Sequence, residues 1–186
     1  MTTPTLSAAI IESDRLVLRK ARDADREGFV EVFTDPEVRA HLGGPRPRAD
    51  VERFLDQAGA AATTAEPGSY VIADKQTDRF VGVLGLAPRA AGRPGHVTPE
   101  GGELELSYVL RRGAWGAGLA FEAAAAVLRA AAAELPDQPV VVVTQAANER
   151  ARRLADRLGF AETGAFEEHG ARQVIAVAAL RAFGAS

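Results

Sequence analysis

The stretch that decides the fold is ELSYVLRRGAWGAGLA, residues 105–120. It begins with the apolar pattern of a strand, continues through a glycine-rich turn and opens a long alanine-rich helix. That order aims unpaired backbone N–H groups and the positive end of a helix dipole at one spot, which binds phosphate without a lysine. The glycines let the backbone approach a ligand closely because they carry no Cβ. We therefore predict a phosphate-binding turn between Ala114 and Ala120.

The glycine spacing excludes two common phosphate-binding loops. Gly113, Gly116 and Gly118 run Gly-x-x-Gly-x-Gly, the reverse of the dinucleotide fingerprint, and no acidic strand end follows about twenty residues later. A nucleotide-binding P-loop needs Gly-Lys followed by Ser or Thr, and these glycines precede no such triplet. A phosphate ligand of another kind is therefore expected.

The turn resembles the pyrophosphate loop of the GCN5-related N-acetyltransferase (GNAT) superfamily, whose motif reads Gln/Arg-x-x-Gly-x-Gly/Ala. Trp-Gly-x-Gly-x-Ala at 115–120, after Glu-x-x-Tyr-x-Leu at 105–110, is similar to the ribosomal-protein-alanine acetyltransferase branch. Gly113 stands where the general motif has Gln or Arg, a departure that this branch often shares. Further pieces follow in the family's order: RLVLR at 15–19, DAD at 23–25, DPEV at 35–38, and Asn148 with Leu-Gly-Phe at 158–160.

The resemblance implies a mixed α/β fold. Its central sheet would be mostly antiparallel, with about seven strands and a splayed central strand pair, flanked by about four helices. Residues 1–14 are expected to form an N-terminal arm, residues 15–182 a single acetyltransferase domain, and residues 88–102 a mobile loop. Hydrophobic periodicity predicts strands at 15–20, 70–73, 80–86, 103–110, 139–144, 161–167 and 173–180, and helices at 25–32, 51–62 and 118–134, with a fourth between Asn148 and Gly159.

The resemblance also implies acetyl-CoA as cosubstrate. A backbone N–H of Val109 or Leu110 would face the thioester carbonyl oxygen, and an oxyanion donor of this type contributes roughly 3–4 kcal/mol. The pyrophosphate would be bound by backbone N–H groups of the turn. The residues expected to contact the cosubstrate are Val109, Leu110, Arg111, Arg112, Trp115, Gly116, Ala117, Gly118, Leu119, Ala120 and Asn148.

Two residues are candidates for catalysis. Glu105, an acidic side chain on a central strand, is the candidate base, and burial would have to raise its pKa for it to act well at neutral pH. The alternative is that Glu103 and Glu105 merely line the wetter face of the strand. Ala151 and Ala155 occupy the positions where the superfamily usually has a Ser or a Tyr as acid. Tyr108, Tyr70 or solvent would then protonate the leaving thiolate.

Composition narrows the classes of partner. The formal net charge of −3 and pI of about 5.7 argue against nucleic-acid binding, and no basic stripe is present. The absence of cysteine excludes thiolate metal sites and acyl-cysteine intermediates. The three histidines share no metal-ligand spacing, so no metal is expected. Neither a signal peptide nor a long uncharged apolar segment is visible, which predicts a cytoplasmic protein without a membrane partner.

The sequence therefore predicts an N-acetyltransferase that transfers acetyl directly to a primary amine within a ternary complex. A protein N-terminus, an amino acid, a polyamine and an amino-bearing antibiotic all remain open as acceptors, because residues 40–50 and 88–102 would build the acceptor pocket. The alternative function is a CoA-binding sensor or interaction module with little or no catalysis. The length of the acyl chain and the oligomeric state, including a homodimer, also stay open.

Overall fold

The strand that carries Glu105 lies near the centre of an eight-stranded sheet in the computed structural model, which describes residues 4–184. The strand order is β1-β2-β3-β4-β5-β6-β8-β7. Only β5 and β6 run parallel, and every other neighbouring pair is antiparallel. The strands are β1 (Ile11–Glu12), β2 (Leu16–Arg19), β3 (Ser69–Asp74), β4 (Phe80–Pro88), β5 (Leu104–Leu110), β6 (Pro139–Gln145), β7 (Ala161–Glu168) and β8 (Ala171–Ala179).

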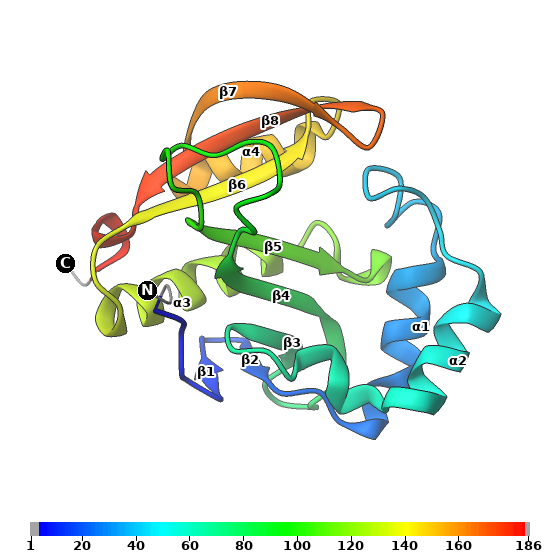
Figure 1. Cartoon of the computed structure of the whole chain (residues 1–186). Coiled ribbons are helices and arrows are strands. Elements are labelled where there is room, and N and C mark those ends of the chain that lie inside the picture. The colour runs from blue at the N-terminus through cyan, green and yellow to red at the C-terminus, as the bar shows by residue number, and fades with distance from the viewer. Residues whose placement is uncertain (1–3, 185–186) are drawn as a thin grey trace.

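Helices cover both faces of the sheet (Figure 1). On one face lie α1 (Arg26–Thr34) and α2 (Arg48–Ala58), and on the other lie α3 (Leu119–Glu134) and α4 (Glu149–Leu158). Among the described residues, no helix is both long and apolar enough to span a bilayer.

The side chains of β5 alternate between two hydrophobic cores, as expected for a central strand. Leu104, Leu106 and Leu110 pack with the buried alanines of α3 in one cluster. Val109 packs against the other cluster, which holds Phe29 of α1 and residues of α2. We refer below to the α3 face and the α1 face of the sheet.

The two parallel strands separate soon after they meet. They pair only at Leu104 with Val140 and at Glu105 with Val141, so the remainder of each strand has no partner on that side. A parallel pair needs a crossover connection, which α3 supplies here. The splay leaves a wedge-shaped opening whose edges are backbone groups of β5 and β6.

The predicted mixed α/β fold with a splayed central strand pair is confirmed. The eighth strand, β1, is only two residues long and lies within the predicted arm, where so short a segment gives no periodic signal. Helix α2 runs from Arg48 to Ala58 and is followed by a 3-10 turn at Ala60–Thr64, so the helix predicted at 51–62 began too late and extended too far. Gly59 has φ of 79°, a conformation that ends helices.

Candidate functional site

The glycine turn places free amides at the start of α3. Gly116 and Gly118 have φ of 81° and 76°, a conformation that side chains with a Cβ rarely adopt. The N–H of Trp115 donates to the Arg112 carbonyl at 3.1 Å, so this amide, expected to bind pyrophosphate, is already used within a 3-10 turn. Within the described residues, the N–H groups of Gly116–Phe121 donate no hydrogen bond, and the first helical donor is Glu122. The run of free amides therefore begins at Gly116, and phosphate binding by it remains a prediction.

Arg15 holds this turn in place from the far end of the sequence. Its Nη1 donates to the Ala117 carbonyl at 3.0 Å, and its Nε donates to Glu122 Oε2 at 2.6 Å. Burial alone would raise the pKa of Glu122, but hydrogen bonds from Ser13 and Arg15 outweigh it and lower that pKa. The ion pair compensates the charge of Glu122, which would otherwise repel an anion at the helix start.

The hydrogen-bond pattern of β5 decides which of its amides face the wedge. The N–H of Arg111 bonds to the Val81 carbonyl, and the N–H of Arg89 bonds to the Glu103 carbonyl. The main-chain N–H and C=O groups of odd-numbered residues in β5 therefore point toward β4. Val109 is therefore turned toward β4, whereas the N–H groups of Tyr108 and Leu110 point into the wedge. The Leu110 carbonyl already accepts from the Trp115 indole at 3.1 Å.

The opposite edge of the wedge is formed by β6, whose backbone the sequence did not single out. Ala146 N–H bonds to the Arg172 carbonyl, so the same alternation directs the main chain of Val143 toward β5. Main-chain groups of Val143 on one edge, and of Tyr108 and Leu110 on the other, thus point into the splay. A run of four valines gives no sign that β6 lines the wedge, because main-chain groups and not side chains line it.

Glu105 and Tyr108 lie on opposite faces of β5, because they are three residues apart. Glu105 is on the α1 face, and Tyr108 is on the α3 face among the residues that pack against the α3 core. Burial raises the pKa of Tyr108 to about 12, although Arg150 nearby lowers it. The phenol therefore keeps its proton throughout the neutral range and can act as a donor.

Glu105 belongs to a cluster of four charges. Arg89, whose side chain is fully buried, donates from Nη1 to Glu105 Oε2 at 2.8 Å. Arg93 forms a two-bond pair with Glu168 and also lies 3.9 Å from Glu105 Oε2. The expected base therefore sits in an ion-pair network, with 19% of its side chain exposed. Within the described residues, Oε1 of Glu105 accepts no hydrogen bond and is left for a ligand.

Glu103 has a structural role instead. Its carboxylate, 1% exposed, accepts from the backbone N–H groups of Val97 and Thr98 at 2.7 Å each, and pairs with His96 Nδ1 at 2.7 Å. Burial would raise the pKa of Glu103, but the His96 and backbone hydrogen bonds together lower it to about 2. These bonds hold residues 96–98 against the start of β5, and the expected mobility of the 88–102 loop remains a prediction.

Glu103 should make the fold sensitive to acid. Its pKa falls from 4.5 unfolded to about 2 folded, so its stabilisation is complete above about pH 4.5 and is lost as the pH falls toward 2. The shift corresponds to about 3 kcal/mol of unfolding free energy. Urea unfolding of wild type and Glu103→Gln should differ most at pH 7 and converge below pH 4. A difference that is the same at pH 3 and pH 7 would contradict this assignment.

Arg111 and Arg112 do not contribute free charge to the turn. Arg111 pairs with Glu31 of α1 at 2.9 Å, and Arg112 pairs with Glu37 at 2.8 Å. They anchor α1 and the following segment beside the turn. Their expected contact with the cosubstrate remains a prediction.

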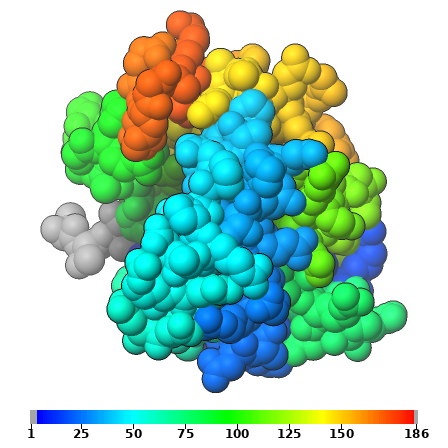
Figure 2. All heavy atoms as spheres, turned by 90° about the vertical axis from the view of Figure 1, so that its right-hand side faces the viewer, coloured from blue at the N-terminus to red at the C-terminus, as the bar shows by residue number. Residues whose placement is uncertain are grey.

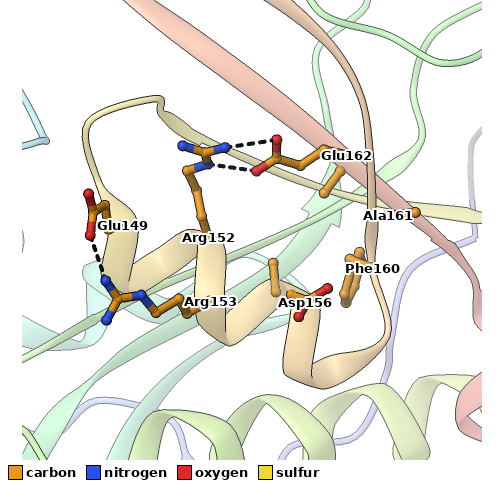
Figure 3. A pocket seen from close by; sticks show the side chains of 9 residues that line it. Glu149, Arg152, Arg153, Asp156, Phe160, Ala161 and Glu162 are labelled. Atoms are coloured by element: carbon orange, nitrogen blue, oxygen red, sulfur yellow. Dashed lines mark hydrogen bonds and ion pairs between the residues drawn. The ribbon is translucent and has the colours of Figure 1, made fainter.

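Arg150 is a cation that the sequence did not distinguish from its neighbours. Its guanidinium lies 3.8 Å from the centroid of the Trp115 ring. Arg152 and Arg153, by contrast, pair with Glu162 and Glu149 around a hollow of about 510 Å³ between α4 and the start of β7 (Figure 3). Among the described residues, Arg150 has no carboxylate within ion-pair distance. Arg150 is thus free to bind phosphate beside the turn. Arg157 of the same helix, which lies 4.9 Å from the centroid of the Phe121 ring, likewise has no carboxylate within ion-pair distance among the described residues.

The remaining candidates have defined places. Asn148 caps α4, because its side-chain oxygen accepts from the Ala151 N–H at 3.2 Å. Ala155 is buried and offers no donor. Tyr70 is fully buried, and its hydroxyl donates to the Ala8 carbonyl at 2.6 Å, which removes it as a candidate acid.

Comparisons with known proteins agree with this architecture. A family model described as "Acetyltransferase (GNAT) domain" matches residues 15–161. The uncharacterized N-acetyltransferase p20 of Bacillus licheniformis is 24% identical over 160 residues, covering 84% of this chain and 85% of that protein. A GNAT-family acetyltransferase structure from Bacillus anthracis superposes with a TM-score of 0.72 at 18% identity, covering 92% of this chain and 98% of that one. RimL, a ribosomal L7/L12 α-N-protein acetyltransferase solved with coenzyme A, gives a TM-score of 0.66 at 15% identity, covering 93% and 99%.

Proposed function

The chain belongs to the GNAT acetyltransferase family, and on that premise we propose that it transfers an acetyl group from acetyl-CoA to a primary amine. The transfer would be direct, within a ternary complex, since the chain has no cysteine to carry an acyl intermediate. The observation that carries the proposal is the set of free amides at Gly116–Phe121 beside the open wedge of β5 and β6.

The residues of the turn and wedge fit coenzyme A. Free N–H groups at a helix start suit a pyrophosphate, and Arg150 adds a cation beside them. The wedge offers backbone donors and acceptors to the amides of a pantetheine arm. RimL, which shares this fold, was solved with coenzyme A. The bound thioester would supply the acetyl group and a thiolate leaving group.

The proposed base and the proposed acid lie on opposite faces of β5. The Leu110 N–H points into the wedge and would polarise the thioester carbonyl. On the α1 face, Glu105 Oε1 would bind the amine and accept its proton, directly or through one water. On the α3 face, the Tyr108 hydroxyl would donate a proton to the leaving sulfur. A thioester threaded through the wedge could meet both groups.

Tyr108→Phe should therefore lower kcat about tenfold without weakening CoA binding. The phenol is a protonated donor on the α3 face of β5, but a CoA thiolate leaves fairly well without help, so the loss should be moderate. Thiol release from acetyl-CoA measures kcat, and calorimetry with CoA measures binding. A variant as active as the wild type would leave solvent as the acid.

A CoA-binding module without useful catalysis is the second candidate. Two observations favour it: Ala151 and Ala155 provide no acid, and Glu105 is already paired with buried Arg89. Thiol release measured against a panel of primary amines separates the two candidates. Turnover with any amine supports the transferase, whereas tight CoA binding without release for every amine supports the module.

A further inference from the structure

The segment between α1 and α2, residues 35–47, closes the open end of the wedge. In Figure 2 it lies between the β7–β8 hairpin and the turn that precedes α3. The segment contacts β6 directly, because His41 Nδ1 lies 3.2 Å from Oε1 of Gln145, the last residue of that strand. Glu37 of the same segment pairs with Arg112 after β5, so the segment borders the wedge on the α1 face from one strand to the other.

We call residues 35–47 the entrance segment. The carboxylates that border it already have partners. Four of them pair with arginines, at 2.8 to 3.0 Å. Asp35 instead accepts from the backbone N–H groups of its own segment. Glu167 alternates to the opposite face of β7 from Glu168. The four pairs are Glu31–Arg111, Glu37–Arg112, Glu105–Arg89 and Glu168–Arg93.

Two arginines of the entrance segment lack such compensation. The guanidiniums of Arg39 and Arg46 lie 5.9 and 5.2 Å from the centroid of the same ring, that of Phe33. Among the described residues, neither has a carboxylate within ion-pair distance. Arg39 donates to the carbonyls of Leu42 and Gly44, so it also shapes the segment. Burial lowers the pKa of Arg39, and repulsion from Arg46 lowers it further.

The entrance therefore carries uncompensated positive charge on a protein whose net charge is −3. A polyamine or another polycation would meet these two arginines and no unpaired carboxylate among the groups just described. A carboxylate near the acceptor amine would instead find two guanidiniums that share one aromatic ring, and arginine binds carboxylates through strong charge-assisted hydrogen bonds.

We propose that the acceptor is an amine flanked by a carboxylate, as in an acidic peptide N-terminus, and that Arg46 together with Arg39 binds that carboxylate. This inference rests on the proposed acetyl transfer and selects among the acceptors that the sequence leaves open. It assigns substrate selection to the entrance segment, and it places polyamines outside the substrate range.

The test uses three peptides that differ only in the two residues after the N-terminal one: two Asp, two Asn or two Lys. A triamine and a free amino acid complete the panel. Wild type should acetylate the Asp peptide with kcat/KM at least tenfold above the Asn peptide, as expected for a charge-assisted contact. Arg46→Gln should bring that ratio to within about threefold, mainly through KM. Raising the salt concentration should also reduce the preference.

Arg48→Gln is the matched control. Arg48 lies two residues further on, and its guanidinium already pairs with Glu52 at 2.7 Å and with Glu27 at 3.5 Å. Arg48→Gln removes the same charge from the same part of the chain, but it should leave the preference for the Asp peptide unchanged. Arg46 is exposed and its side chain makes no hydrogen bond within the described residues, so the test variant should fold normally.

Failure of this inference can be told apart from failure of the proposed function. Fastest transfer to the Lys peptide or the triamine, or an unchanged Asp/Asn ratio in Arg46→Gln, would overturn the inference while acetyl transfer stands. If no amine is acetylated, calorimetry of the Asp peptide with CoA-loaded protein still tests whether Arg46 binds the carboxylate. Binding that weakens about tenfold in Arg46→Gln but not in Arg48→Gln supports the carboxylate site, and equal binding in all three proteins overturns it.

Discussion

Gly118→Val should weaken CoA binding at least 100-fold. Gly118 has φ of 76° and is the residue from which α3 starts, a conformation that a β-branched residue avoids. Valine would cost roughly 1–2 kcal/mol in backbone strain if the turn kept its shape. If the turn relaxed instead, the amides of Gly116–Phe121 would no longer converge. Each lost charge-assisted bond to phosphate costs about 1.5–3 kcal/mol, so the loss of two accounts for the expected change.

Gly113→Ala is the control for this variant. Gly113 precedes the same turn, but its φ is not positive and a Cβ there would meet nothing within 4 Å. Its CoA affinity should stay within about twofold of wild type when both variants are titrated by calorimetry. Equal affinities for Gly118→Val and wild type would show that the turn does not bind the phosphates.

Glu105→Gln should lower kcat about 100-fold or more at neutral pH, while CoA binds as before. A general base commonly contributes 10²–10⁴-fold, and glutamine cannot accept the proton. The amide keeps the shape of the side chain and can still accept from Arg89, so the fold should survive. CoA affinity should be unaffected because the phosphate cradle lies at the start of α3, away from the carboxylate.

Glu168→Gln is the matched control, because Glu168 belongs to the same ion-pair cluster. It pairs with Arg93 at 3.0 Å and lies 3.6 Å from Arg89, but it comes from the β7–β8 hairpin. Its kcat should fall less than fivefold in the thiol-release assay. If the two variants lose activity equally, the cluster acts as a structural unit, and Glu105 has no separate role as base.

Much of the fold was predictable because its signals are local. Period-two and helical patterns located the main strands and helices, and the glycine spacing located the turn before α3. The spacing of Glu105 and Tyr108 also predicts that they lie on opposite faces, since three is an odd number of residues along a strand. The brief eighth strand was missed because two residues carry no pattern.

The contacts that define the site join residues far apart in sequence, and for these the sequence offers no rule. Arg15 bonds to Ala117, 102 residues away, and Arg89 bonds to Glu105, 16 residues away. Whether an arginine is free or paired depends on such contacts. Arg150 and Arg153 look alike in sequence, yet one lies on Trp115 and the other pairs with Glu149.

A titration of ¹⁵N-labelled protein with coenzyme A, followed by amide resonances, tests the phosphate cradle most directly. The N–H signals of Gly116, Gly118 and Ala120 should move downfield in proportion to occupancy, and those of Leu110 and Val143 should respond to the pantetheine arm. Pantetheine, which lacks the phosphates, should move only the signals of Leu110 and Val143. If coenzyme A binds while the 116–120 amides stay unchanged, or does not bind at all, the account of this site is contradicted.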